Sequence, residues 1–256
     1  MTEPDFQTTS SAGSRSSETS TLKETTMKKI LASMTALLLS LHAAAAPKSD
    51  SADKLGKDIA VFYKNPSAER AASLMDQLVK ADIMRETTLA WGTQALQKYP
   101  QGSTIWCDNI RTYQGDALTF AAYTLTLTGT NQAKTCLNSL TLDTELKNNL
   151  KKNQSFHPLQ KPIISPASLD FHWVTYFATG NPKAVERIVD YIIKAQTAAA
   201  QRPNHVDLTL ASAIWSTRSN MEQDTAIDSI VRQYIQKQPE ASKKRLEQAL
   251  LAPKDD

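Results

Sequence analysis

Apolar residues recur at helical spacing in four segments of the chain. In each segment they recur at spacings such as i, i+3, i+4 and i+7, which places the apolar side chains on one side of an α-helix. The four stripes are Ala71, Leu74, Met75, Leu78 and Val79; Val185, Ile188, Val189 and Ile192; Val206, Leu210, Ala213, Ile214 and Thr217; and Ile227, Ile230, Val231 and Tyr234. This pattern predicts amphipathic helices that each bury one face.

Three polar–proline pairs mark the expected starts of helices: Asn65-Pro66, Ser165-Pro166 and Asn181-Pro182. An Asn or Ser side chain can accept a hydrogen bond from a free N–H of the first helical turn. Proline suits the next position, because its missing N–H would have had no partner there. We therefore predict helices that begin directly after Asn65, Ser165 and Asn181.

The segment 123–129 alternates apolar residues with threonine, which is typical of a β-strand. An internal repeat favours a helix instead, because residues 118–129 align without gaps with residues 169–180 and five of the twelve positions are identical. The second copy has a helical stripe, formed by Leu169, Trp173, Tyr176 and Phe177. We therefore predict a helix in both copies. A weaker third copy spans residues 208–219.

Repeated helix–turn–helix units imply hairpins that stack side by side, since a single amphipathic hairpin cannot bury its apolar face alone. The predicted fold class is all-α, with stacked helical hairpins in an irregular α-solenoid or a two-lobed helical array. The repeat copies begin at residues 118, 169 and 208, so their spacing is irregular.

Through the turn Thr179-Gly180-Asn181-Pro182 and the helices around it, the chain loosely resembles tetratricopeptide-like helical-hairpin repeat proteins. It departs from that family in two respects: it does not keep a period of about 34 residues, and Trp91-Gly92 is not part of a W-x-x-L-G-x-x-Y motif. The resemblance implies a binding scaffold.

Prolines divide the predicted helical region into two lobes. Pro158, Pro162 and Pro166 follow one another at four-residue spacing, which the interior of a helix would not tolerate. We predict an N-terminal helical lobe over residues 46–146, a proline-containing linker over 147–165 and a C-terminal helical lobe over 166–256.

Residues 27–45 have the three parts of a secretory signal peptide. Lys28 and Lys29 precede the uncharged run Ile30–Leu41, and small alanines follow, so cleavage is expected before Ala46. The alternative is a retained membrane anchor, which usually needs about 20 apolar residues. We predict a periplasmic or secreted protein with no membrane span after cleavage.

Residues 1–26 are rich in Ser and Thr and have no apolar period, so we predict a disordered leader. Either this leader lies upstream of the true start at Met27, or it is an unusually long first part of the signal peptide.

Composition excludes several classes of function. The chain has 29 Lys and Arg against 26 Asp and Glu, a balance that does not indicate a nucleic-acid partner. It has only seven glycines, which argues against a turn-rich β fold and against a phosphate-binding loop.

No motif identifies a catalytic, cofactor or metal site. His157, His172 and His205 have no metal-ligand spacing, although His205 and Asp207 lie two residues apart. Asp170, Asp190 and Asp207 could pair for acid–base chemistry only if the fold brought them together.

The four tryptophans, Trp91, Trp106, Trp173 and Trp215, are expected mainly in the core, with one or two lining a groove. The candidate partner-binding residues are His172, Trp173 and Tyr176.

Cys107 and Cys136 are the only cysteines, and both would be exported together. We expect them in two parallel neighbouring helices that begin near Ser103 and Asn131, with the helix Asp116–Thr128 between them. That arrangement predicts an intramolecular disulfide, which an oxidising compartment favours. The alternative is a pair of small buried thiols.

Taken with the predicted export, these features favour a bacterial helical scaffold that binds a protein or peptide partner in the cell envelope, in a groove between the lobes. Two alternatives are an envelope-polymer hydrolase with an unrecognised carboxylate or histidine site, and a passive structural envelope protein.

Overall fold

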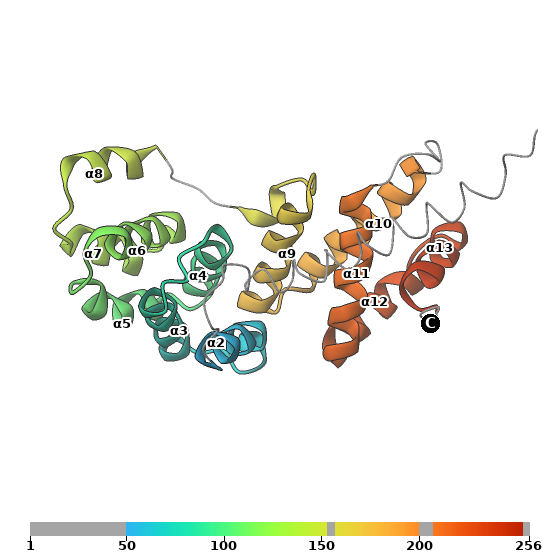
Figure 1. Cartoon of the computed structure of the whole chain (residues 1–256), viewed down its shortest axis with the longest axis horizontal. Helices are drawn as coiled ribbons and strands as arrows, with labels where there is room; N and C mark the ends of the chain where they lie inside the picture. The colour runs from blue at the N-terminus through green and yellow to red at the C-terminus, as the bar shows by residue number, and fades with distance from the viewer. Residues whose placement is uncertain (1–49, 153–156, 200–206, 253–256) are drawn as a thin grey trace, which may run out of the picture. The chain divides into compact units, whose positions relative to one another are not determined.

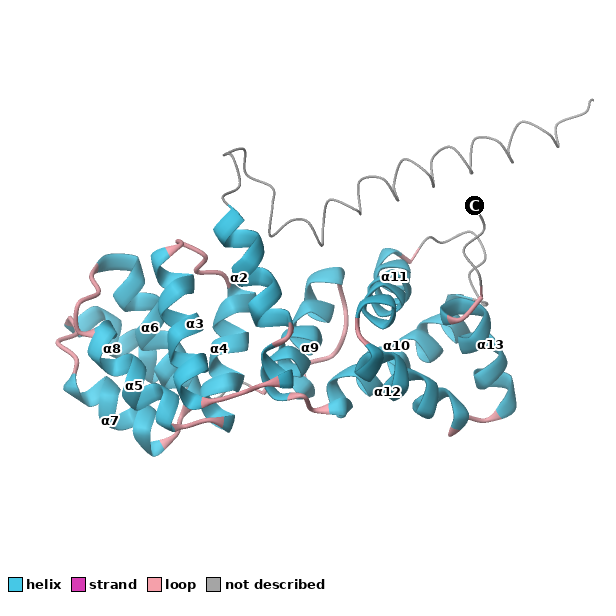
Figure 2. Ribbon diagram, turned by 90° about the horizontal axis from the view of Figure 1, so that it is seen from below, coloured by secondary structure: helices cyan, strands magenta, loops and turns pink. Residues whose placement is uncertain are grey.

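The protein folds as α-helices joined by short turns (Figure 1). The computed structural model describes residues 50–152, 157–199 and 207–252, which all belong to one compact unit. Its elements are α2 (Asp50–Ala60), η2 (Phe62–Lys64), α3 (Ala68–Lys80), α4 (Glu86–Lys98), α5 (Gln101–Ile110), α6 (Gly115–Thr128), α7 (Asn131–Ser139), α8 (Thr144–Lys151), η3 (Pro158–Gln160), α9 (Pro166–Thr179), α10 (Pro182–Ala199), α11 (Leu208–Gln223), α12 (Thr225–Gln236) and α13 (Glu240–Leu250). Within these ranges there is no strand (Figure 2), so the all-α prediction is confirmed.

Several predictions fall outside the described residues: the leader 1–26, the signal peptide 27–45, part of the linker, and Val206 and His205.

Two of the three predicted helix starts are confirmed, and the third is displaced. Ser165 Oγ accepts from Ser168 N (3.3 Å) at the start of α9, and Asn181 Oδ1 accepts from Lys183 N (3.1 Å) at the start of α10. Asn65 instead ends η2, and α3 begins three residues later. The cap of α3 is Ser67, whose Oγ accepts a hydrogen bond from Arg70 N at 3.1 Å. The backbone is still extended at Ser67, so the helix begins only after it.

The threonine-rich segment 123–129 lies in α6 and the turn that follows it, so the helix prediction is confirmed there. Thr124 Oγ1 donates to the Phe120 carbonyl (2.9 Å), and Thr128 Oγ1 donates to the Thr124 carbonyl (2.8 Å). These bonds satisfy hydroxyls that the helix buries, which explains how a strand-like pattern fits a helix.

The repeat copy in α9 has the same arrangement. Thr175 donates to the Phe171 carbonyl and Thr179 to the Thr175 carbonyl, each at 2.6 Å. Both helices end at a glycine in the left-handed region, with φ of 69° at Gly129 and 64° at Gly180. Glycine is favoured there because other side chains would be strained.

The helices pack in two layers, which can be followed in Figure 1. In the first array, α3, α5 and α7 are successive neighbours in one layer, and α4, α6 and α8 are successive neighbours in the other. α9 packs against α4 and so extends the second layer, while α2 packs against both α3 and α9. In the second array, α9, α11 and α13 contact one another in order, and α10 packs against α12. Stacked hairpins are therefore present, and α9 belongs to both arrays.

Two hydrophobic cores underlie these arrays. Core 1 is built by α2–α8 together with Ala178, and core 2 is built by α9–α13. On α9, Leu169, Trp173 and Tyr176 are members of core 2, whereas Ala178 belongs to core 1. Phe177 packs against both cores. One helix is thus buried on two sides, and the first array is completed by a helix that was predicted to lie in the C-terminal lobe.

The start of the predicted linker is corrected by the structure. Residues 147–151 form the end of α8, whose Leu146 and Leu150 are buried in core 1. Farther along, Pro158 begins η3 and is buried, and Leu159 packs against core 2. Residues 153–156 lie outside the described part of the chain. The proline-rich segment is therefore partly helical and partly packed.

Candidate functional site

The predicted partner-binding residues His172, Trp173 and Tyr176 lie inside the protein. Their exposed fractions are 1%, 4% and 1%. Trp173 Nε1 donates to Ser216 Oγ (3.2 Å), and the ring of Tyr176 packs on that of Tyr63 with centroids 4.6 Å apart. The prediction of a binding surface at these residues is corrected accordingly: Trp173 and Tyr176 are packing residues of core 2, and His172 is buried beside them on α9.

Asp170 and His172 on α9 are titratable groups in poorly solvated surroundings. Burial raises the pKa of the Asp170 carboxyl to about 6. Burial lowers the pKa of His172; the Lys161 backbone opposes that shift, and the charge of Arg187 adds to it. The His172 ring is therefore neutral at pH 7. A carboxyl with a pKa near 6 can exchange a proton close to neutral pH, as a general acid or base must.

The other candidate carboxylates have structural partners. Asp190 accepts a hydrogen bond from the Tyr234 hydroxyl, and Asp207 Oδ1 accepts from Leu210 N (2.9 Å) as the cap of α11. Among residues 50–152, 157–199 and 207–252, no group of three or more His, Cys, Asp or Glu side chains is arranged to hold a metal ion. Asp190 and Asp207 thus serve packing and capping.

One face of α11 is exposed and partly apolar. It comprises Leu208, Ala211, Trp215, Arg218 and Glu222, which recur at three- and four-residue intervals; we call this set the α11 surface. Leu208 is 48% exposed and Trp215 is 37% exposed. The opposite side of the helix, with Ala213, Thr217 and Met221, is buried. Because tryptophan side chains are usually largely buried, an exposed one beside another exposed apolar residue makes this face the strongest candidate for contact with another molecule.

The α11 surface runs at its C-terminal end into a shallow open depression of about 440 Å³. Met221, Leu250 and Leu251 supply apolar lining, while Arg218 and Glu222 supply charges of both signs. Arg218 Nη2 also donates to the Ala252 carbonyl (2.8 Å), which fixes the end of α13 beside α11. An apolar strip therefore leads into a hollow with a mixed polar rim.

The tryptophans agree with the expectation that most of them lie in the core, and Trp215 is the exposed one. Trp91, Trp106 and Trp173 are buried, at 0%, 0% and 4% exposure. The sequence did contain a signal for the difference, because Trp215 lies off the apolar stripe of its own segment and lines up with Leu208 seven residues earlier.

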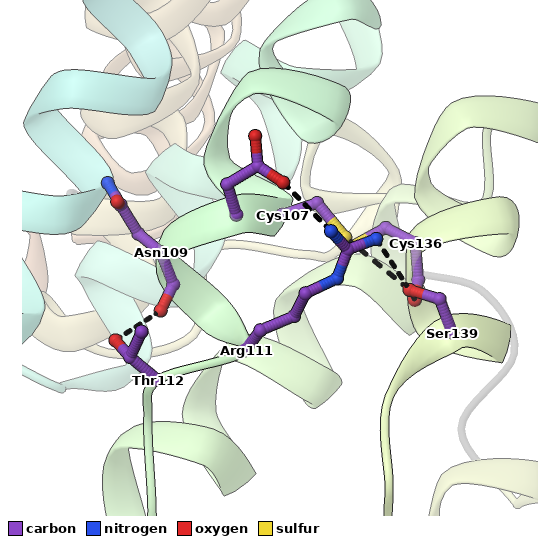
Figure 3. A network of polar contacts seen from close by, with 7 residues as sticks. Cys107, Asn109, Arg111, Thr112, Cys136 and Ser139 are labelled. Carbon is purple, nitrogen blue, oxygen red and sulfur yellow. Dashed lines mark hydrogen bonds and ion pairs between the residues drawn. A yellow bond between two sulfur atoms is a disulfide. The ribbon is translucent and has the colours of Figure 1, made fainter.

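Cys107 on α5 and Cys136 on α7 lie at disulfide distance, with their Cα atoms 5.7 Å apart (Figure 3). The two helices are neighbours in one layer, as predicted. Arg111 lies over this pair: its guanidinium is 2.9 Å from Asp108 Oδ1, and it donates to Ser139 Oγ at 3.5 Å. Both cysteines are at most 5% exposed, which makes the pair a structural link between helices.

None of the described helices is long and apolar enough to cross a membrane. No protein-family model matches the chain, and neither the curated proteins nor the solved structures contain a match to it. The resemblance to helical-hairpin repeat proteins therefore rests on the turn Thr179-Gly180-Asn181-Pro182 and on the stacked hairpins.

Proposed function

We propose that the protein is an exported helical scaffold that binds a protein or peptide partner in the cell envelope through the α11 surface. The observation that carries this proposal is the exposure of Leu208 and Trp215, 48% and 37%, on one face of a helix whose other side is buried. Tryptophan is the residue type that most often dominates the binding energy of protein interfaces.

The size of this face indicates the kind of partner. From Leu208 to Glu222 the helix rises by about 20 Å, at roughly 1.5 Å per residue. A strip of that length and about 10 Å width is far smaller than the roughly 800 Å² per partner of a standard interface. A short helical or extended segment with apolar side chains fits it best, and Arg218 and Glu222 would then contact polar groups of the partner at one end.

Site-specific cross-linking tests the contact. A photo-reactive residue placed at exposed Ala211 should capture one partner, whereas the same residue at exposed Ala241 on α13 should not. After mass-spectrometric identification, the purified partner should bind Trp215→Ser at least about ten-fold more weakly than the unchanged protein. Ile105→Ser alters another apolar residue of similar exposure (42%), on α5, and should bind normally. Equal binding by both variants would refute the α11 surface as the contact.

Export is tested separately by the intact mass of protein recovered from the envelope. The mature chain should begin within a residue or two of Ala46, because small alanines precede that position in the predicted signal. A species that retains Met27 or the whole apolar run would contradict export with cleavage.

The hydrolase alternative is favoured by one observation, the pKa of about 6 at Asp170. If Asp170 is the acid or base of such an enzyme, Asp170→Asn should abolish release of fragments from purified envelope polymer while the circular dichroism spectrum stays unchanged. Absence of fragment release by the unchanged protein would remove this alternative.

A further inference from the structure

The short helix η2 reaches into both cores. Phe62, its first residue, is fully buried in core 1. Its ring meets those of Trp91 and Tyr99 edge to face, at centroid distances of 5.2 and 5.8 Å. This end of η2 is therefore fixed to the first array.

The next two residues contact the second array. The Tyr63 ring packs on Tyr176, and the Tyr63 hydroxyl donates to Asp224 Oδ2 at 2.5 Å. The Lys64 ammonium lies 2.9 Å from the same carboxylate oxygen. We call Tyr63, Lys64 and Asp224 the η2 clip. It joins positions 161 residues apart in the sequence, one before α3 and the other between α11 and α12.

Asp224 is held within the second array by hydrogen bonds at the junction of α11 and α12. It ends α11, where its N–H donates to the Asn220 carbonyl (2.9 Å), and it begins α12, where its Oδ1 accepts from Ala226 N (3.0 Å). Burial would raise the pKa of this carboxyl, but the hydrogen bonds from Tyr63, Lys64 and Ala226 outweigh it and leave the pKa lowered. The carboxylate is therefore charged, 9% exposed and supplied with three donors.

Arg70 secures the backbone on the other side. From α3 its guanidinium donates to the carbonyls of Asp58 (3.1 Å), Phe62 (3.3 Å) and Asn65 (3.0 Å). The backbone of η2 cannot follow Asp224 away from α3 without breaking these charge-assisted bonds. A displacement of α11 and α12 would therefore either break the η2 clip or disturb the first array.

We propose that the η2 clip is an interlock that holds α10–α13 onto α2–α8 and makes their separate opening rare. α9 supplies apolar surface to both arrays, so α10–α13 can in principle detach and leave α9 on core 1. The charged hydrogen bonds of the η2 clip oppose that partial opening directly. Without them, the opening of α10–α13 becomes more frequent, and hydrogen exchange detects such local openings. This inference does not depend on the proposed function.

Hydrogen exchange at increasing urea, on the full chain, tests the interlock with matched variants. Tyr63→Phe removes one hydroxyl from the η2 clip and keeps the ring. Tyr113→Phe removes the equivalent hydroxyl from the bond to Asp76 within the first array, which measures 2.7 Å. Tyr234→Phe does the same for the bond to Asp190 within the second array. All three deletions remove a tyrosine–carboxylate hydrogen bond, and only the first lies between the arrays.

In the unchanged protein, amides of α12 should exchange through an opening of α10–α13 alone, whereas amides of α5 should exchange only when the first array opens. Tyr63→Phe should make the openings seen at α5 and at α12 more frequent by the same factor, at least about ten-fold, because the η2 clip is broken in both; this is the effect expected for loss of a hydrogen bond to a charged group. Tyr113→Phe should change α5 and leave α12 unchanged, because its bond stays intact when α10–α13 open alone, and Tyr234→Phe should change both.

Asp224→Asn keeps an acceptor for Ala226 N and removes the charge, so it should make both openings more frequent, as Tyr63→Phe does. An unchanged opening at α12 in Tyr63→Phe, or an equal change at α12 in Tyr113→Phe, would overturn the interlock.

Discussion

The rings of Phe62 and Trp91 meet edge to face, with their centroids 5.2 Å apart and their planes at 78°. Both side chains are fully buried, so this contact lies inside core 1. It brings a residue of the short η2 helix against the middle of α4, and it explains why a three-residue element is firmly held.

Replacing Phe62 by alanine should lower the free energy of unfolding by about 3–5 kcal/mol, because the change removes a buried ring and leaves a cavity. The neighbouring Val61 is 38% exposed, so Val61→Ala should cost less than about 1 kcal/mol. Urea denaturation followed by circular dichroism measures both. Similar losses for the two variants would show that η2 is not anchored through its aromatic ring.

Two glycines inside helices should respond to alanine with opposite signs. A Cβ at Gly102 would lie 2.8 Å from Leu96 Cδ2 and 3.0 Å from the Ala68 carbonyl oxygen, where α5 crosses close to α3. Gly102→Ala should therefore destabilise by about 1–3 kcal/mol. No atom lies within 4 Å of the corresponding point at Gly56, so Gly56→Ala should stabilise by about 0.5–1 kcal/mol through helix propensity. Thermal melts decide both signs.

Asp170 should give the stability a distinct pH dependence. Its pKa is raised from 3.8 to about 6 on folding, so the folded state holds this proton more tightly. The associated stability is present below pH 3.8 and is lost as the pH rises through about 6. Asp170→Asn should therefore be more stable than the unchanged protein at pH 8, by about 1–3 kcal/mol, and this advantage should shrink towards pH 4.

Urea denaturation of Asp170→Asn and of the unchanged protein at pH 4 and pH 8 measures this difference. If the difference is the same at both pH values, the Asp170 carboxyl is solvated in the folded protein.

The cysteine pair should be oxidised in protein isolated without reductant. Alkylation of the unfolded, unreduced chain should then find no free thiol. Cys107 and Cys136 are 29 positions apart, so reduction should lower the stability by roughly 3–4 kcal/mol on the loop-entropy model and lower the melting temperature. The double variant Cys107→Ser/Cys136→Ser should melt at a temperature that reductant does not change. Two alkylated thiols in freshly isolated protein would contradict the bond.

Local patterns predicted most of the helices, because periodicity and caps act over a few residues. The aligned glycines Gly129 and Gly180 identified α6 and α9 as equivalent, against the strand-like threonines of α6. The start of α3 was misplaced because an Asn-Pro pair also suits the end of a 3₁₀ turn, and Ser67 was the better cap in the resulting backbone.

Contacts between distant segments could not be predicted from such patterns. Nothing near Tyr63 indicates Asp224, and nothing in α9 indicates that it packs against α4 as well as α10. For that reason His172, Trp173 and Tyr176 were predicted to be available for binding, although the packing of α9 buries them. The outward direction of Trp215 could have been predicted from the sequence, because it depends only on the position of Trp215 relative to the apolar stripe of one helix.

The packing of α9 on both α2 and α4 also sets the order in which the chain can acquire structure. A simple array of hairpins can grow from its first unit, since each new hairpin needs only the preceding one. Here the first unit stays incomplete until residues 166–179 are available, after α3–α8 have been made. During that interval the side of α4 that α9 covers is open to water and to other chains. A chain shortened after α9 keeps core 1 closed, whereas one shortened after α8 leaves an apolar helix face without its cover, and we expect it to associate with itself.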